Sequence, residues 1–170
     1  SLDGMLPLED YSMEGRTYKY FTGTPLYPFG HGLSYTSFAY SGLKVPGTVK
    51  AGDTVEVSVT VTNTGTRAGD EVVQLYVTDR EASAPVPIRK LAGFRRIHLG
   101  AGASRRVTFT IDPKDLSLIT DDTRRVIEPG VFDLSAGGKQ PGFSGTADAA
   151  TTGVVMGRFT VTGGPVELGL

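Results

Sequence analysis

Hydrophobic and polar residues alternate along most of the chain after residue 36. The clearest run is TVEVSVTVTN (residues 54–63), in which valine occupies every second position and polar residues occupy most of the others. An alternation with a period of two is typical of a β-strand with one buried face, because successive side chains point to opposite sides. This run therefore predicts a half-buried strand.

Similar runs follow at short intervals, separated by turns that contain glycine. EVVQLYVTD (71–79) places three apolar residues on one face and Tyr76 on the opposite, polar face. The further candidates are KLAGFRRIHL (90–99), RRVTFTID (105–112), RRVIEPGVFDLSAG (124–137) and GRFTVTG (157–163). About seven strands at this spacing predict an all-β fold, an antiparallel β-sandwich.

Two segments of this β-region depart from the strand pattern. Asp112 followed by Pro113 is typical of the start of a helix, and we expect one short turn that ends near Leu116. Residues 139–153 (KQPGFSGTADAATTG) are small, polar and rich in glycine, and we expect a long mobile loop there.

The first 35 residues have no regular pattern but many aromatic side chains. Nine of the fifteen Tyr and Phe residues lie within residues 1–40. Disordered segments are poor in aromatics, so we expect an extended but ordered arm over 1–35, followed by the sandwich over 36–170. Nine buried aromatics would hide more than about 1,300 Å², the size of a protein–protein interface. We therefore expect much of this arm to lie on a partner or a domain that the sequence lacks.

Composition narrows the functions that this chain can have. The formal net charge is −1 and no basic stripe is present, so nucleic acid is not an expected partner. The chain has no cysteine, which excludes thiol catalysis and disulfides. No apolar run approaches the roughly 18 residues that span a bilayer, so no membrane is expected. The first residues lack an initiator methionine and the pattern of a signal peptide, and we expect a piece of a longer protein.

Several motifs, taken together and in order, resemble one known family. GRTYKYF (15–21) and PLYPFGHGLSY (25–35) precede TVTNTG (60–65), AGDEVVQLYV (68–77), RKLAGFRRIHL (89–99) and EPGVFDLSAGG (128–138). This order resembles the C-terminal region of glycoside hydrolase family 3, whose members are exo-acting β-glucosidases, β-xylosidases and relatives that retain configuration. The resemblance implies a fibronectin type III-like (immunoglobulin-like) sandwich of about seven strands, reached by the aromatic-rich arm.

The same resemblance implies a non-catalytic module that stabilises and positions catalytic domains. In the family the nucleophile lies on a TIM barrel and the acid/base usually on an α/β-sandwich domain. No stretch here matches the nucleophile's motif, so no catalytic residue is assigned, and no cofactor or metal is expected. The implied partners are those two domains, on the same or a separate chain, with a homodimer as a further option. A periplasmic or secreted location is implied by the family alone. The alternative is a free-standing carbohydrate-binding or adhesion module.

The arm supplies the candidate site residues. Eight of them are candidates for docking on the missing domains: Arg16, Tyr18, Tyr20, Phe21, Tyr27, Phe29, His31 and Tyr35. Asp10 and Tyr11 are candidates to approach a substrate pocket built elsewhere, because the arm passes near domain junctions in the parent enzymes. His31 lies between two glycines, and we expect it to be buried at a junction with its ring nitrogens hydrogen-bonded.

The remaining titratable residues do not predict an independent enzyme. Glycoside hydrolysis needs two carboxylates about 5–5.5 Å or about 6.5–9.5 Å apart across a pocket. The pairs Asp70–Glu71 and Asp121–Asp122 are adjacent in sequence, and adjacent strand residues point to opposite faces. We expect both pairs to be solvated turn acids and His98 to be a surface residue.

Overall fold

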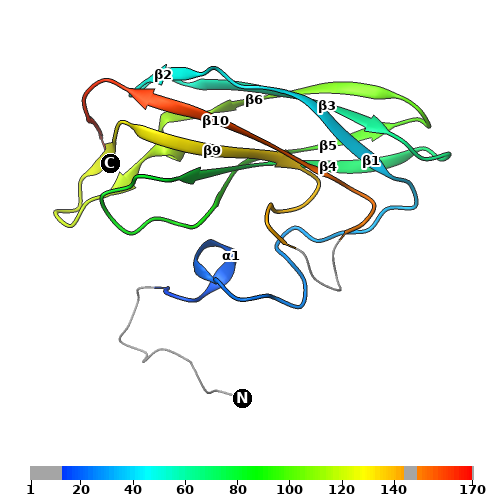
Figure 1. The fold of residues 1–170 in the computed structure, drawn as a ribbon, viewed down its shortest axis with the longest axis horizontal. Helices are drawn as coiled ribbons and strands as arrows, with labels where there is room; N and C mark the ends of the chain where they lie inside the picture. Colours follow the sequence, from blue (N-terminus) through cyan, green and yellow to red (C-terminus); the bar gives the residue numbers. More distant parts are fainter. Residues whose placement is uncertain (1–12, 144–148, 170) are drawn as a thin grey trace, which may run out of the picture.

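The fold is an all-β sandwich, as the alternation predicts. The computed structural model describes residues 13–143 and 149–169, and its strands run roughly along the long axis of the molecule (Figure 1). Seven strands have seven or more residues: β1 (Phe38–Lys44), β3 (Val55–Asn63), β4 (Gly69–Asp79), β5 (Lys90–Leu99), β6 (Ser104–Ile111), β9 (Gly130–Gly137) and β10 (Val154–Thr162). Four more have two or three residues: β2 (Thr48–Lys50), β7 (Leu118–Ile119), β8 (Arg125–Ile127) and β11 (Val166–Leu168). The expected number of about seven long strands is therefore confirmed.

The strands form two main sheets and one small one. The first sheet has the order β1-β3-β6, the second β2-β10-β9-β4-β5, and the small one β11-β8-β7. Strand β3 is central in its sheet, and its odd-numbered residues from Val55 to Asn63 are all buried. The register pairs Val57 with Phe109 on β6, so both strands send their apolar sides into the same core.

The core lies between the two main sheets. In the second sheet Phe132 of β9 pairs with Phe159 of β10, and their rings stack with centroids 5.4 Å apart. The alternating valines of β3 and the odd-numbered apolar residues of β4 belong to the same core, together with apolar residues of β1, β5 and β6. Burial of this apolar surface is the main force that holds the two sheets together.

Polar side chains form specific hydrogen bonds where two of the strands end. Asp112 accepts a hydrogen bond from the backbone N–H of Lys114 at 2.9 Å and caps the 3₁₀ helix η1 (Pro113–Leu116), as predicted. Asn63 ends β3 fully buried, and its side chain makes four hydrogen bonds. Its amide donates to the carbonyls of Arg67 and Leu99, and its carbonyl oxygen accepts from the Thr36 hydroxyl and the Gly65 N–H.

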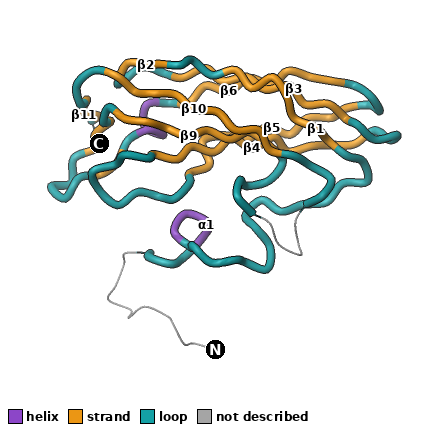
Figure 2. The backbone as a smooth tube through the Cα atoms, viewed as in Figure 1, coloured by secondary structure: helices purple, strands orange, loops and turns teal. Residues whose placement is uncertain are grey.

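The central part of strand β4, residues 73–77, is buried on both faces, which the alternation did not predict. Val73, Leu75 and Val77 face the core, and Gln74 and Tyr76 on the opposite face are also buried. The expectation that Tyr76 stands on a polar, solvent-facing side is wrong. The reason is the arm, which covers this outer face with the one-turn helix α1 (Thr17–Tyr20) beneath β4 and β9 (Figures 1 and 2).

Candidate docking site

The arm is anchored to the outer face of the second sheet by Tyr18. Its ring stacks on Phe29 of the same arm, with centroids 4.0 Å apart and planes at 16°. It also meets Tyr76 edge-on, with a centroid distance of 6.3 Å. Its hydroxyl accepts a hydrogen bond from the Leu91 N–H of β5 at 3.3 Å. One arm residue therefore contacts both the arm and two neighbouring strands.

Backbone hydrogen bonds add further attachment points. The Ile88 N–H donates to the carbonyl of Lys19 at 2.8 Å. The amide of Gln74 donates to the carbonyl of Gly30 at 3.2 Å, and the Tyr76 hydroxyl donates to Oε1 of Gln74. The arm thus replaces water as the hydrogen-bonding partner of the polar groups on β4, which is why Gln74 and Tyr76 can be buried there.

Other apolar side chains of the arm point away from the sandwich. Tyr35 is 96% exposed, Leu26 87%, Leu33 74% and Tyr27 67%. Phe21 and Phe29 are also exposed in part. The ring of Tyr27 pairs with the ring of His31, another arm residue, at a centroid distance of 5.1 Å. So many exposed large side chains in one segment are typical of an interaction surface.

The other candidates of the arm are placed as follows. Arg16 is half-buried just before α1, and its backbone N–H donates to the carbonyl of Met13. Tyr20 is half-buried at the end of α1. His31 is half-buried, but its Nδ1 atom is buried with no hydrogen-bond partner in the part of the chain that the structure describes. The expected hydrogen bonds to both ring nitrogens are therefore not found within the described residues. Asp10 and Tyr11 lie outside the described residues.

Glu71 corrects the expectation that the Asp70–Glu71 pair is solvated. Glu71 is only 7% exposed, and its carboxylate accepts hydrogen bonds from the hydroxyls of Tyr40 and Thr152. Burial raises its pKa, and these two hydrogen bonds oppose that rise. Glu71 is odd-numbered, like the residues of β4 that face the core. The alternation in the sequence therefore already indicated that its side chain points inward.

The other acids of the expected turn pairs are more exposed. Asp70 lies on the opposite side of β4 from Glu71 and binds His98 and Arg96 of β5. Hydrogen bonds from these two partners lower the pKa of Asp70. His98 has an exposed ring, as expected, and Asp121 and Asp122 are exposed turn residues. Within the described residues no group of three His, Cys, Asp or Glu side chains is placed to hold a metal.

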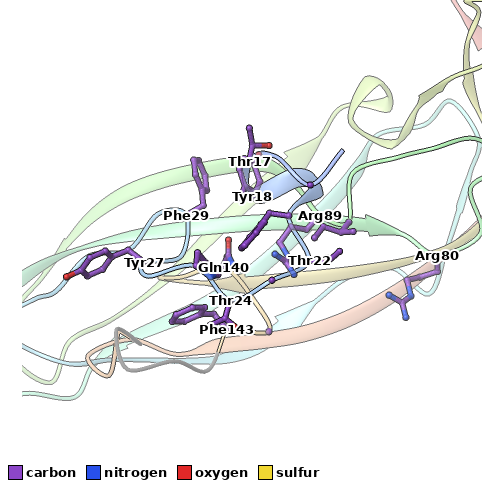
Figure 3. A pocket seen from close by; sticks show the side chains of 16 residues that line it. Thr17, Tyr18, Thr22, Thr24, Tyr27, Phe29, Arg80, Arg89, Gln140 and Phe143 are labelled. Atoms are coloured by element: carbon purple, nitrogen blue, oxygen red, sulfur yellow. The ribbon is translucent and has the colours of Figure 1, made fainter. Parts of the chain in front are cut away.

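Two depressions border the arm. The larger, of about 980 Å³, lies between the arm and the loops before β5 and after β9 (Figure 3). The smaller, of about 400 Å³, is lined by the Gly30–Ser34 stretch and by Val72, Leu91 and Phe94 of the sheet. Leu33, Val72 and Phe94 are all exposed apolar residues, so the apolar surface continues from the arm onto β4 and β5. Among the described residues no helix has the length and apolar character needed to cross a bilayer.

Comparisons with known proteins agree with this architecture. Residues 71–140 match the fibronectin type III-like domain family. The chain is 46% identical over 121 residues to a β-xylosidase of Formosa agariphila, covering 71% of this chain and 17% of that protein. It is 40% identical over 126 residues to β-glucosidase BoGH3A of Bacteroides ovatus, covering 73% of this chain and 17% of that protein.

Solved structures give the same result. A β-glucosidase of Erythrobacter marinus superposes with a TM-score of 0.72 at 37% identity, over 86% of this chain and 18% of that one. A β-glucosidase of Listeria innocua superposes with a TM-score of 0.71 at 30% identity, over 82% of this chain and 18% of that one. The chain thus spans less than a fifth of the length of these relatives.

Proposed function

We propose that this chain is a non-catalytic module of a glycoside hydrolase family 3 β-glucosidase or β-xylosidase. The support for this proposal is its fibronectin type III-like domain, which matches the C-terminal region of such enzymes. In this proposal the module stabilises the catalytic domains and fixes their position. The whole enzyme removes terminal β-linked sugars, and its catalytic carboxylates lie on domains outside this chain.

The observation that carries the proposal is the exposed apolar side of the arm. Tyr35, Leu33 and Leu26 are each more than two-thirds exposed, although they flank a segment that is bonded to the sheet. Each such side chain gains roughly 1.5–3 kcal/mol if it becomes fully buried. This exposed apolar surface is available for contact with the catalytic domains. The arm that carries it continues directly into the sandwich.

The test is a chimera in which this chain replaces the matching part of the Formosa agariphila β-xylosidase. We expect the chimera to hydrolyse an aryl β-xyloside and the chain alone to show no turnover. Leu33→Ser and Tyr35→Ser should lower the thermal midpoint of the chimera and leave that of the isolated chain unchanged. Ile119→Ser, at an exposed apolar position on β7, is the matched control and should have little effect in either protein. Equal losses in chimera and isolated chain would refute the docking role.

A second candidate is a carbohydrate-binding module, which the aromatic lining of the larger depression favours. Aromatic rings beside polar side chains are suited to stacking on a sugar. Isothermal titration of the isolated chain with xylo- and cello-oligosaccharides separates the two. Saturable binding would favour this second function, and the docking proposal expects none.

A further inference from the structure

The larger depression, which we call the groove, combines apolar walls with two polar groups: within the described residues one has no hydrogen-bond partner and the other makes no ion pair. Its walls include Tyr18, Tyr27 and Phe29 of the arm and Phe143 of the loop after β9 (Figure 3). Gln140 and Arg89 reach the same space from the two loops that border the arm (Figure 3). None of the described residues that line the groove is acidic.

The side-chain oxygen of Gln140 lacks a hydrogen-bond donor within the described residues. Its side chain is only 5% exposed, and Oε1 is buried with no hydrogen-bond partner among residues 13–143 and 149–169. Buried polar atoms in folded proteins are nearly always paired, because an unpaired one costs free energy. A donor from outside this chain, at the position where Gln140 borders the groove, would remove that cost.

Arg89 carries a positive charge that no acidic side chain among the described residues balances. Its guanidinium is half-buried and makes no ion pair with any described residue. Arg80, the other basic residue of the groove, already pairs with Asp133 at 3.3 Å. A guanidinium offers a planar fork of donors that fits a carboxylate better than any other side chain does. The groove is therefore suited to an acidic group.

We propose that the groove receives a polypeptide segment of the preceding catalytic domains, with an Asp or Glu bound to Arg89 and a backbone N–H bound to Oε1 of Gln140. This proposal rests on the proposed function and names the contact that docking would make. More than four-fifths of each relative's length lies outside the part that this chain matches, so such a segment is available in the same polypeptide. Tyr18 and Phe29 already stack on each other, which leaves fewer free ring faces for a sugar.

The first test is a zero-length crosslink between an amine and a carboxylate in the chimera described above. Arg89→Lys keeps the charge and supplies the amine, and a carbodiimide should join it to an Asp or Glu of the catalytic domains. Arg105→Lys, at an exposed arginine on β6 that has no ion pair within the described residues, is the matched control and should give no crosslink between domains. An active chimera without a crosslink at position 89 would refute the groove contact while the docking role of Leu33 and Tyr35 still stands.

The second test compares how one substitution at Gln140 changes the thermal midpoint of the isolated chain and that of the chimera. Gln140→Met removes the unpaired oxygen at nearly constant volume, so the thermal midpoint of the isolated chain should stay the same or rise. In the chimera the same substitution removes a hydrogen bond to the docked segment, so the midpoint should fall. A rise in both proteins would overturn the proposal. So would oligosaccharide binding to the isolated chain that Arg89→Ala abolishes, because the groove would then be a sugar site.

Discussion

Replacing Tyr18 with Ala should detach the arm from the sandwich without unfolding the sandwich. The substitution removes the stack on Phe29, the edge contact with Tyr76 and the hydrogen bond from the Leu91 N–H. Each aromatic pair contributes about 0.5–1.5 kcal/mol beyond burial, and a neutral hydrogen bond about 0.5–1.5 kcal/mol. Because Tyr18 is half-exposed and its hydrogen bond is long at 3.3 Å, we expect a total of about 2–3 kcal/mol.

The assay is hydrogen exchange of the Ile88 amide, which is protected only while the arm is bound, since it donates to the carbonyl of Lys19. A loss of about 2–3 kcal/mol corresponds to exchange roughly 30- to 150-fold faster at this amide. The amide of Val57 in the central strand β3 should keep its protection. Tyr35→Ala is the matched control, because that ring is 96% exposed. Unchanged exchange at Ile88 in the Tyr18 variant, or an equal effect of the Tyr35 variant, would refute the described arrangement.

Three further substitutions test the interior of the sandwich. Asn63→Ala removes four hydrogen bonds and should lower the free energy of unfolding by about 3 kcal/mol, measured by urea denaturation. The raised pKa of Glu71 means that the free energy of unfolding of the native chain falls as pH rises from 4.5, the ordinary value, to the folded-state pKa, and then levels. Glu71→Gln still accepts from Tyr40 and should remove that fall, and an unchanged difference between pH 4 and pH 7 would contradict the assignment. Gly138→Ala places a methyl group against both the carboxylate of Glu71 and the hydroxyl of Thr152, so it should lower the thermal midpoint, measured by thermal denaturation, whereas an unchanged midpoint would contradict this packing.

The sandwich could be predicted from the sequence because its strands follow a local rule. In β3 valine occupies every second position from Val55 to Val61, and these valines are all buried. The cap of η1 is equally local, because Asp112 and Pro113 are neighbours of the turn that they start. The parity of Glu71 also predicts an inward position, but an acid at the end of a strand is ordinarily solvated. Its burial is stabilised by hydrogen bonds from the loop residue Thr152 and the β1 residue Tyr40, and neither residue is near Glu71 in sequence.

The arm could be predicted only in outline. Its aromatic content indicates an ordered segment that packs on something, and the proposal that it docks on absent domains stays a prediction. No pattern within residues 13–35 shows that Tyr18 faces inward while Tyr35 faces outward, because the segment has no repeating backbone geometry. Because the position of the arm could not be predicted, Tyr76 was expected to lie on a polar face without a cover. Burial of the outer face of β4 depends on Tyr18, which lies 58 residues before Tyr76 in the chain.

If the arm docks as we propose, its two sides have different consequences for assembly. The inner side, with Tyr18 and the carbonyl of Gly30, orders the arm on the sandwich before any partner is present. Ordering a flexible segment during docking costs free energy, so an arm that is already held lets more of the energy of burying Leu33 and Tyr35 appear as stability of the complex. Tyr18 can therefore strengthen docking without contacting the partner. In the scaffold role that we propose, a rigid arm would also fix the position of the sandwich relative to the domain on which the arm docks.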